Sequence, residues 1–148
     1  MDIVLLFPGQ GSQKAGMGKD LAEAFPVARG VFGEVDAAIG ADISRLCFEG
    51  PADELTATKN AQPALFAHGA AVWAITKEAL FPHVRAAAGH SLGEFTAYHA
   101  ADAISLPGAA RLVRRRGELM FETGTARPGT MAAILGATTT PIADLCAR

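Results

Sequence analysis

The sequence predicts an α/β fold, and three features of the chain support this class. Two short apolar runs, Ile3–Phe7 and Val84–Ala88, have the length and composition of buried strands. Segments with helical periodicity, rich in alanine, occupy most of the chain between and after these runs. At Gly89–Gly93 the pattern G-x-S-x-G marks a sharp turn from the second run into a helix. Strands that alternate with helices in this way are typical of a parallel sheet covered by helices.

Composition and charge exclude several classes of protein. The chain has 148 residues, of which 50% are hydrophobic and 19% charged, as in a globular domain with a core. A formal net charge of −2 gives no electrostatic basis for binding nucleic acid or an anionic membrane. No window approaches the roughly 20 apolar residues of a membrane span, and the start of the chain lacks the basic flank of a signal peptide. Because Cys47 and Cys146 lack metal-ligand spacing, we expect reduced thiols in a cytoplasmic protein and no metal site.

The first strand, Ile3–Phe7, is a continuous apolar run that we expect to be buried on both faces. It leads into Phe7–Gln13, a loop with glycines on either side of Gln10, where a backbone N–H can approach a ligand closely. Taken alone, this loop favours an ordinary turn between a strand and a helix. It lacks the third glycine of a dinucleotide site and the Lys-Ser/Thr of a P-loop.

Several helical segments are expected between the two strands: Met17–Ile39 with a break near Phe25–Pro26, Ile43–Gly50 as irregular chain or one turn, Pro51–Thr58, and Asn60–Leu80. Asn60–Leu80 is apolar over most of its surface, so we expect it to be buried. Pro63 lies near its first turn, where proline is tolerated.

The turn at Gly89–Gly93 makes Ser91 the candidate nucleophile. A serine forced into so tight a turn has a strained backbone, and its hydroxyl projects into open space. A side chain at position 89 or 93 would collide with neighbouring backbone, which accounts for both glycines. The following helix, Leu92–Ala103, directs its free N–H groups and positive end towards charge that develops beside the serine.

The segment Leu106–Glu122 is predicted to be a helix with one cation in an unusual position. Its apolar stripe consists of Ala109, Leu112, Val113, Leu119 and Met120. Its polar side consists of Arg111, Arg114, Arg115 and Glu118. Arg116 falls within the apolar stripe, where a guanidinium is costly unless an anion pairs with it. Spacing leaves two interpretations open: a structural ion pair with a core carboxylate, or a fork that binds a substrate carboxylate.

Four motifs occur in one order: Phe7–Gln13, Gln62–Leu65, Gly89–Phe95, and Arg116–Gly117 with Met120. This order resembles the malonyl-CoA:acyl carrier protein transacylase family, which includes acyltransferase domains of polyketide synthases. The resemblance covers essentially the whole chain. It implies transfer of a malonyl group from coenzyme A to the phosphopantetheine thiol of acyl carrier protein, through a serine ester and in two steps. It implies no cofactor beyond these substrates.

The resemblance also implies roles for individual residues. Ser91 matches the family's nucleophile, and Gln10 and Leu92 match the positions whose backbone N–H groups form the oxyanion hole. Donors of this kind are commonly worth about 3 kcal/mol each in the transition state. Arg116 matches the arginine that pairs with the free malonate carboxylate, which favours the second interpretation of its position. Gln62 matches a residue near the pocket.

The resemblance implies an α/β-hydrolase-like core in residues 1–124 and the first strand and helix of a ferredoxin-like small subdomain in 125–148, after a linker at Thr123–Gly129. Members of the family are considerably longer and carry their catalytic histidine beyond this region. We therefore expect an N-terminal part of a transacylase, inactive alone, with the missing C-terminal half as a possible partner.

A serine hydroxyl needs a base to become a nucleophile, and none of the four histidines is well placed. His99 is about 12 Å further along the helix from Ser91. His83 precedes the strand whose far end carries the serine. His90 should diverge from its neighbour at the turn, and His68 should be a satisfied core residue.

Other functions remain open on the sequence alone. A serine esterase or thioesterase-type hydrolase shares G-x-S-x-G, but it accounts neither for Arg116 nor for the Phe7–Gln13 loop. A polyketide synthase-associated acyltransferase would share every motif. A non-enzymatic remnant that only binds carrier protein would need no active serine.

Overall fold

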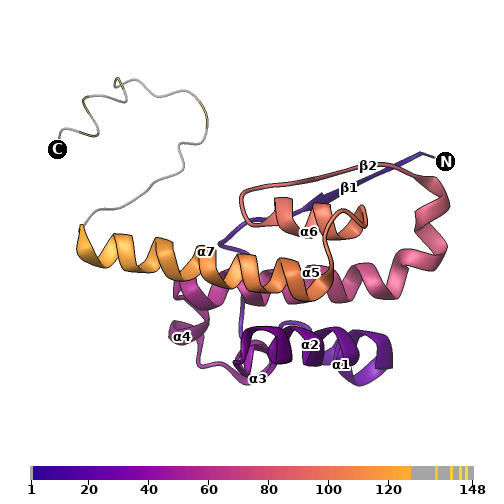
Figure 1. Ribbon diagram of the computed structural model, residues 1–148, viewed down its shortest axis with the longest axis horizontal. Helices are drawn as coiled ribbons and strands as arrows, with labels where there is room; N and C mark the ends of the chain where they lie inside the picture. Colours follow the sequence, from indigo (N-terminus) through magenta and orange to yellow (C-terminus); the bar gives the residue numbers. More distant parts are fainter. Residues whose placement is uncertain (1, 128–135, 137–140, 142–143, 145, 147–148) are drawn as a thin grey trace.

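The computed structural model describes residues 2–127 together with 136, 141, 144 and 146, and it has a mixed α/β architecture (Figure 1). The elements follow in the order β1 (Ile3–Phe7), α1 (Lys19–Ala24), α2 (Pro26–Ile39), α3 (Ile43–Glu49), α4 (Ala52–Thr56), α5 (Thr58–Leu80), a 3₁₀ turn η1 (Phe81–His83), β2 (Val84–Gly89), α6 (Gly93–Ala100) and α7 (Leu106–Ala126). The predicted order of strands and helices up to α7 is therefore confirmed, except that Ile43–Glu49, expected to be irregular or a single turn, is a helix of seven residues. The predicted strand at Thr130–Leu135 and helix from Thr140 lie outside the described residues.

The two strands pair in parallel, with Val4 opposite Ala86 and Phe7 opposite Gly89. Helix α6 packs against both strands on one face, and Figure 1 shows it between the strands and the long helices α5 and α7. On the other face Val4 is 57% exposed and Leu6 is 77% exposed. The prediction that the first strand is buried on both faces is wrong, because the described helices cover only one face of the pair.

The core lies where α5 packs against α2 and α7, and Figure 1 shows α5 and α7 running alongside each other through the middle of the molecule. Its largest fully buried apolar side chains are Phe32, Phe66, Leu55, Leu92 and Val35. The buried character predicted for α5 is confirmed: its alanines at 61, 64, 67, 70 and 71 are fully buried. Small side chains there let the neighbouring helices approach closely.

Helix α7 differs from the prediction in two respects. It continues through Ala126, where the sequence predicted a linker from Thr123 onward, and the Thr123 hydroxyl donates to the carbonyl oxygen of Leu119 at 2.8 Å. Its buried residues are Leu106, Ala109, Ala110, Val113 and Gly117, whereas Leu112 and Leu119 are 51% and 46% exposed. Apart from Leu106 at its start, α7 therefore buries small residues and Val113, while Leu112 and Leu119 lie outside the core, so the predicted apolar stripe is rotated relative to the observed one.

Within the described part of the chain, no helix combines the length and apolarity needed to cross a membrane. In the same residues, no three His, Cys, Asp or Glu side chains are grouped so that they could hold a metal ion.

Candidate active site

The turn between β2 and α6 holds Ser91 in a left-handed backbone conformation, with φ of 57°. The backbone N–H of His90 donates to the Phe7 carbonyl oxygen at 3.0 Å, which ties the start of the turn to the end of β1. Left-handed conformations cost a non-glycine residue roughly 1–2 kcal/mol. The predicted strained turn at Ser91 is confirmed.

The glycines on either side of this turn are required by close backbone contacts. A Cβ on Gly89 would lie 2.0 Å from the carbonyl carbon of Gly93, and a Cβ on Gly93 would lie 2.4 Å from the carbonyl oxygen of Phe7. Neither neighbour is a side chain that could rotate away. The steric reason predicted for the G-x-S-x-G spacing is confirmed, and the contacts show that β1 also shapes the turn.

Arg116 lies beside the serine. Its Nη2 donates to Ser91 Oγ at 2.9 Å, and its Nη1 donates to Gln62 Oε1 at 2.5 Å. Gln62 is only 1% exposed, and Arg116 is half-buried. Within the described residues no acidic side chain lies within ion-pair distance of this guanidinium, so no structural ion pair with a core carboxylate forms there. The arrangement leaves a half-buried positive charge next to a hydroxyl.

Two contacts between α5 and α7 set the position of Arg116. A Cβ on Gly117 would lie 2.9 Å from the carbonyl oxygen of Thr58, so the helices meet backbone to backbone at that point. Pro63 has no N–H to donate to the carbonyl four residues earlier, that of Lys59. Arg114 Nη1 donates to this Lys59 carbonyl oxygen at 3.2 Å.

Arg114 belongs to the polar side predicted for its helix, a position that by itself indicates no role. The structure shows that it also contacts Asn60 Oδ1 at 3.1 Å and, through Nε, Glu118 Oε1 at 2.7 Å. The hydrogen bond from Arg114 lowers the pKa of the Glu118 carboxyl group, assisted by the charge of the same guanidinium. The proline in the second turn of α5 was the available signal, because it predicts a carbonyl that needs another donor.

Gln10 and Leu92 present backbone N–H groups from the two segments that flank the serine. Leu92 follows Ser91, is 1% exposed and has a right-handed helical conformation with φ of −61°. In the loop after β1, the N–H of Gly11 donates to Gln13 Oε1 at 2.8 Å. Among the described residues, neither the Gln10 N–H nor the Leu92 N–H donates to a protein acceptor. Both N–H groups are therefore available to an oxygen atom of a ligand.

No histidine donates to or accepts from the serine within the described residues, where Arg116 is the hydrogen-bond partner of Ser91 Oγ. The Nδ1 atom of His99 lies 3.2 Å from the carbonyl oxygen of Ile104, which holds its ring away from the turn. The ring of His90 packs against Gly9, where an added Cβ would lie 2.4 Å from Nδ1.

His68 is half-buried at the wall of a cavity, so the expectation that it is a satisfied core residue is wrong. Burial lowers the pKa of His68, and the negative charge of Asp20 partly opposes this shift.

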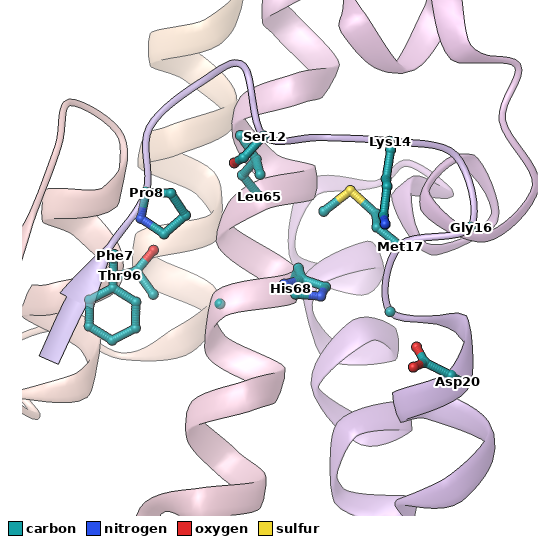
Figure 2. A pocket seen from close by; sticks show the side chains of 12 residues that line it. Phe7, Pro8, Ser12, Lys14, Gly16, Met17, Asp20, Leu65, His68 and Thr96 are labelled. Carbon is teal, nitrogen blue, oxygen red and sulfur yellow. The ribbon is translucent and has the colours of Figure 1, made fainter.

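This cavity has a volume of about 510 Å³ (Figure 2). It is lined by residues of the loop after β1, of α5 and of α6, and by the segment that leads into α1: Phe7, Pro8, Ser12, Lys14, Gly16, Met17, Gly18, Asp20, Leu65, His68, Gly69 and Thr96. Ser91, Gln62 and Arg116 are not among its lining residues. The cavity and the candidate site therefore share the Phe7–Gln13 loop but are separate.

These features define a class of protein: an α/β protein with a candidate serine nucleophile in a strand-to-helix turn, beside a guanidinium that has no acidic partner among the described residues. The sequence model of the acyl transferase domain matches residues 4–146. The chain belongs to the acyl transferase domain family.

Individual relatives agree with this assignment. The chain is 51% identical over 135 residues to a malonyl CoA-acyl carrier protein transacylase of Bacillus subtilis (strain 168), covering 90% of this chain and 42% of the relative. It is 40% identical over 141 residues to the protein of the same name from Escherichia coli (strain K12), which covers 95% of this chain and 46% of that relative. The chain thus spans less than half the length of these relatives.

Solved structures show the same likeness. The crystal structure of an acyl-carrier-protein-S-malonyltransferase from Bartonella henselae matches with a TM-score of 0.78 and 50% identity, covering 81% of this chain and 39% of that one. A malonyl-transacylase in complex with its type II polyketide synthase acyl-carrier protein matches with a TM-score of 0.77 and 43% identity, covering 82% and 40%.

Proposed function

We propose that this chain carries the nucleophile and the carboxylate-binding residues of a malonyl-CoA:acyl carrier protein transacylase. The observation that carries the proposal is the guanidinium of Arg116, 2.9 Å from Ser91 Oγ and without an acidic partner among the described residues. In a malonyl group the carboxylate carbon lies about 2.5 Å from the acyl carbon, two C–C bonds away. A malonyl group on Ser91 therefore brings its carboxylate beside Arg116, whereas an acetyl group leaves the cation without an anion.

The reaction runs in two steps at Ser91. The hydroxyl oxygen attacks the thioester carbon of malonyl-CoA, the C–S bond breaks, and coenzyme A leaves as the thiol once a proton reaches its sulfur. The N–H groups of Gln10 and Leu92, which donate to no acceptor in the part of the chain that the structure describes, are proposed to stabilise the oxyanion. The phosphopantetheine thiol of acyl carrier protein then attacks the ester carbon, the bond between that carbon and Ser91 Oγ breaks, and the proton of the attacking thiol is transferred to Ser91 Oγ.

The general base is proposed to come from outside this chain. None of its four histidines hydrogen-bonds to Ser91, and the chain covers 42% of its Bacillus subtilis relative.

We further propose that residues 1–124 are part of an α/β-hydrolase-like core, that 125–148 begin a ferredoxin-like subdomain, and that the rest of such a domain covers the exposed face at Val4 and Leu6. Helix α7 crosses the proposed boundary and ends at Ala126.

The test joins this chain to the part of the Bacillus subtilis relative that lies beyond the matched region. We expect a malonyl adduct on Ser91 by mass spectrometry after incubation with malonyl-CoA, and transfer to acyl carrier protein. Acetyl-CoA should load far less, and Arg116→Ala should remove that preference. Ser91→Ala is the control without a nucleophile, and the unjoined 148-residue chain should show little or no steady-state transfer.

Three results would contradict the proposal. Equal loading of acetyl and malonyl groups that Arg116→Ala does not change would favour a serine hydrolase. Full steady-state transfer by the unjoined chain would show that the base is already present. Absence of any adduct in the joined protein, with native folding, would leave a non-catalytic binding role.

A further inference from the structure

Gln62 forms a hydrogen bond at each end of its side-chain amide. Its Oε1 accepts from Arg116 Nη1 at 2.5 Å, and its Nε2 donates to the sulfur of Met120 at 3.2 Å. We propose that Met120 is a positioning residue: its thioether fixes the orientation of the Gln62 amide, which holds the Arg116 guanidinium for an acyl carboxylate on Ser91. This inference rests on the proposed function, and it adds a residue that acts through Gln62 and Arg116.

Donor and acceptor chemistry admits one orientation of this amide. If the amide were rotated by half a turn, its NH₂ would face the NH₂ of Arg116 and its oxygen would face a sulfur lone pair. Both contacts would then be repulsive. A thioether is a weak acceptor, but Gln62 is 1% exposed, so water cannot readily replace it. Losing a buried partner costs more than the contact itself is worth.

The positions of the three residues explain how Met120 can act on Arg116 through Gln62. Arg116 and Met120 are four residues apart on α7 and therefore share one face of that helix. Gln62, from α5, contacts both. With Nη1 held by Gln62, the guanidinium presents Nη2 to Ser91 Oγ at 2.9 Å. An arriving carboxylate then meets a cation whose side-chain freedom is already restricted, which favours binding.

Met120 is 36% exposed, so it can be substituted with little effect on the core. Leucine has a similar volume but no acceptor. Glutamine has a similar length and supplies a carbonyl oxygen in place of the sulfur. Leu119→Ala is the matched control, because Leu119 is the neighbouring residue, is 46% exposed and makes no side-chain hydrogen bond.

The first measurement uses the 148-residue chain without any substrate. Side-chain NMR follows the NH₂ of Gln62 and the Nε–H of Arg116, assigned by their loss in Gln62→Ala and Arg116→Lys. In Met120→Leu we expect hydrogen exchange at both groups to accelerate by roughly threefold to tenfold. Met120→Gln and Leu119→Ala should keep the native rates. Unchanged exchange at Gln62 in Met120→Leu would overturn the proposal.

The second measurement uses the joined protein described under the proposed function. Met120→Leu should lower the preference for malonyl-CoA over acetyl-CoA by roughly threefold to tenfold, and Met120→Gln should restore it. Accelerated exchange with an unchanged preference would overturn the positioning role. Failure of the proposed function has a different signature: Arg116→Ala would leave the preference unchanged, while the exchange rates would still respond to Met120→Leu.

Discussion

Ser91 offers a direct measurement of the strain stored at the turn. The variants Ser91→Ala and Ser91→Gly both remove the hydroxyl and its hydrogen bond from Arg116, so they lose the same polar contact. They differ in the backbone, because alanine must still adopt the left-handed conformation with φ of 57°. Glycine adopts that conformation without steric cost.

The expected difference can be worked from these terms. A non-glycine residue in the left-handed region costs roughly 1–2 kcal/mol. Glycine loses more conformational entropy than alanine on folding, which reduces the stability of the glycine variant by about 0.5–1 kcal/mol. Ser91→Gly should therefore be more stable than Ser91→Ala by about 1 kcal/mol, or roughly 4 °C in Tm for a domain of this size. Urea unfolding followed by circular dichroism measures the difference.

A nearby exposed residue provides the control. Ala101 has φ of −84°, on the ordinary side of the backbone map, so Ala101→Gly should destabilise the protein by about 0.5–1 kcal/mol. If glycine is more stable than alanine at position 91 but less stable than alanine at position 101, the backbone at the serine is strained. If glycine destabilised both positions relative to alanine, the turn would carry no strain, and the steric account of G-x-S-x-G would fail.

Three further predictions use the same chain. Gly93→Ala should cost about 3 kcal/mol or more in urea unfolding, because its Cβ would lie 2.4 Å from a backbone oxygen, whereas Gly30→Ala, with nothing within 4 Å, should be neutral or stabilising. Burial, and to a lesser extent the negative charge of Asp36, raises the pKa of the Cys47 thiol to about 12. Cys47 should therefore resist a disulfide reagent until the protein unfolds. The stability that the thiol form contributes should be lost as pH rises from about 9 through about 12. Burial lowers the pKa of His68 below 6.5, so stability should fall as pH drops from 6.5 through the lowered pKa, and His68→Gln should lessen that fall in urea titrations at several pH values.

The sequence was most informative where structure depends on adjacent residues. The strained serine, the two glycines around it and the strand before it follow from steric rules that act within a few residues, and the structure confirms them. The rotation of α7 was mispredicted, because hydrophobic periodicity cannot tell which of two overlapping faces meets the neighbouring helix. The exposed face of β1, with Leu6 77% exposed, was mispredicted for a similar reason: an apolar run shows that a strand can be buried, but not what covers it.

The position of Arg116 depends both on the local sequence of α7 and on how that helix packs. Its type and position were evident from the sequence, but its distance from Ser91 depends on how closely α7 approaches α5. Gly117 allows that approach, since any Cβ there would meet the Thr58 carbonyl oxygen at 2.9 Å. Pro63 adds a second contact between these helices: because proline has no N–H, the Lys59 carbonyl oxygen can accept a hydrogen bond from Arg114 of α7. A glycine and a proline, usually read as helix breakers, thus bring a cation on one helix to a serine that follows a distant strand.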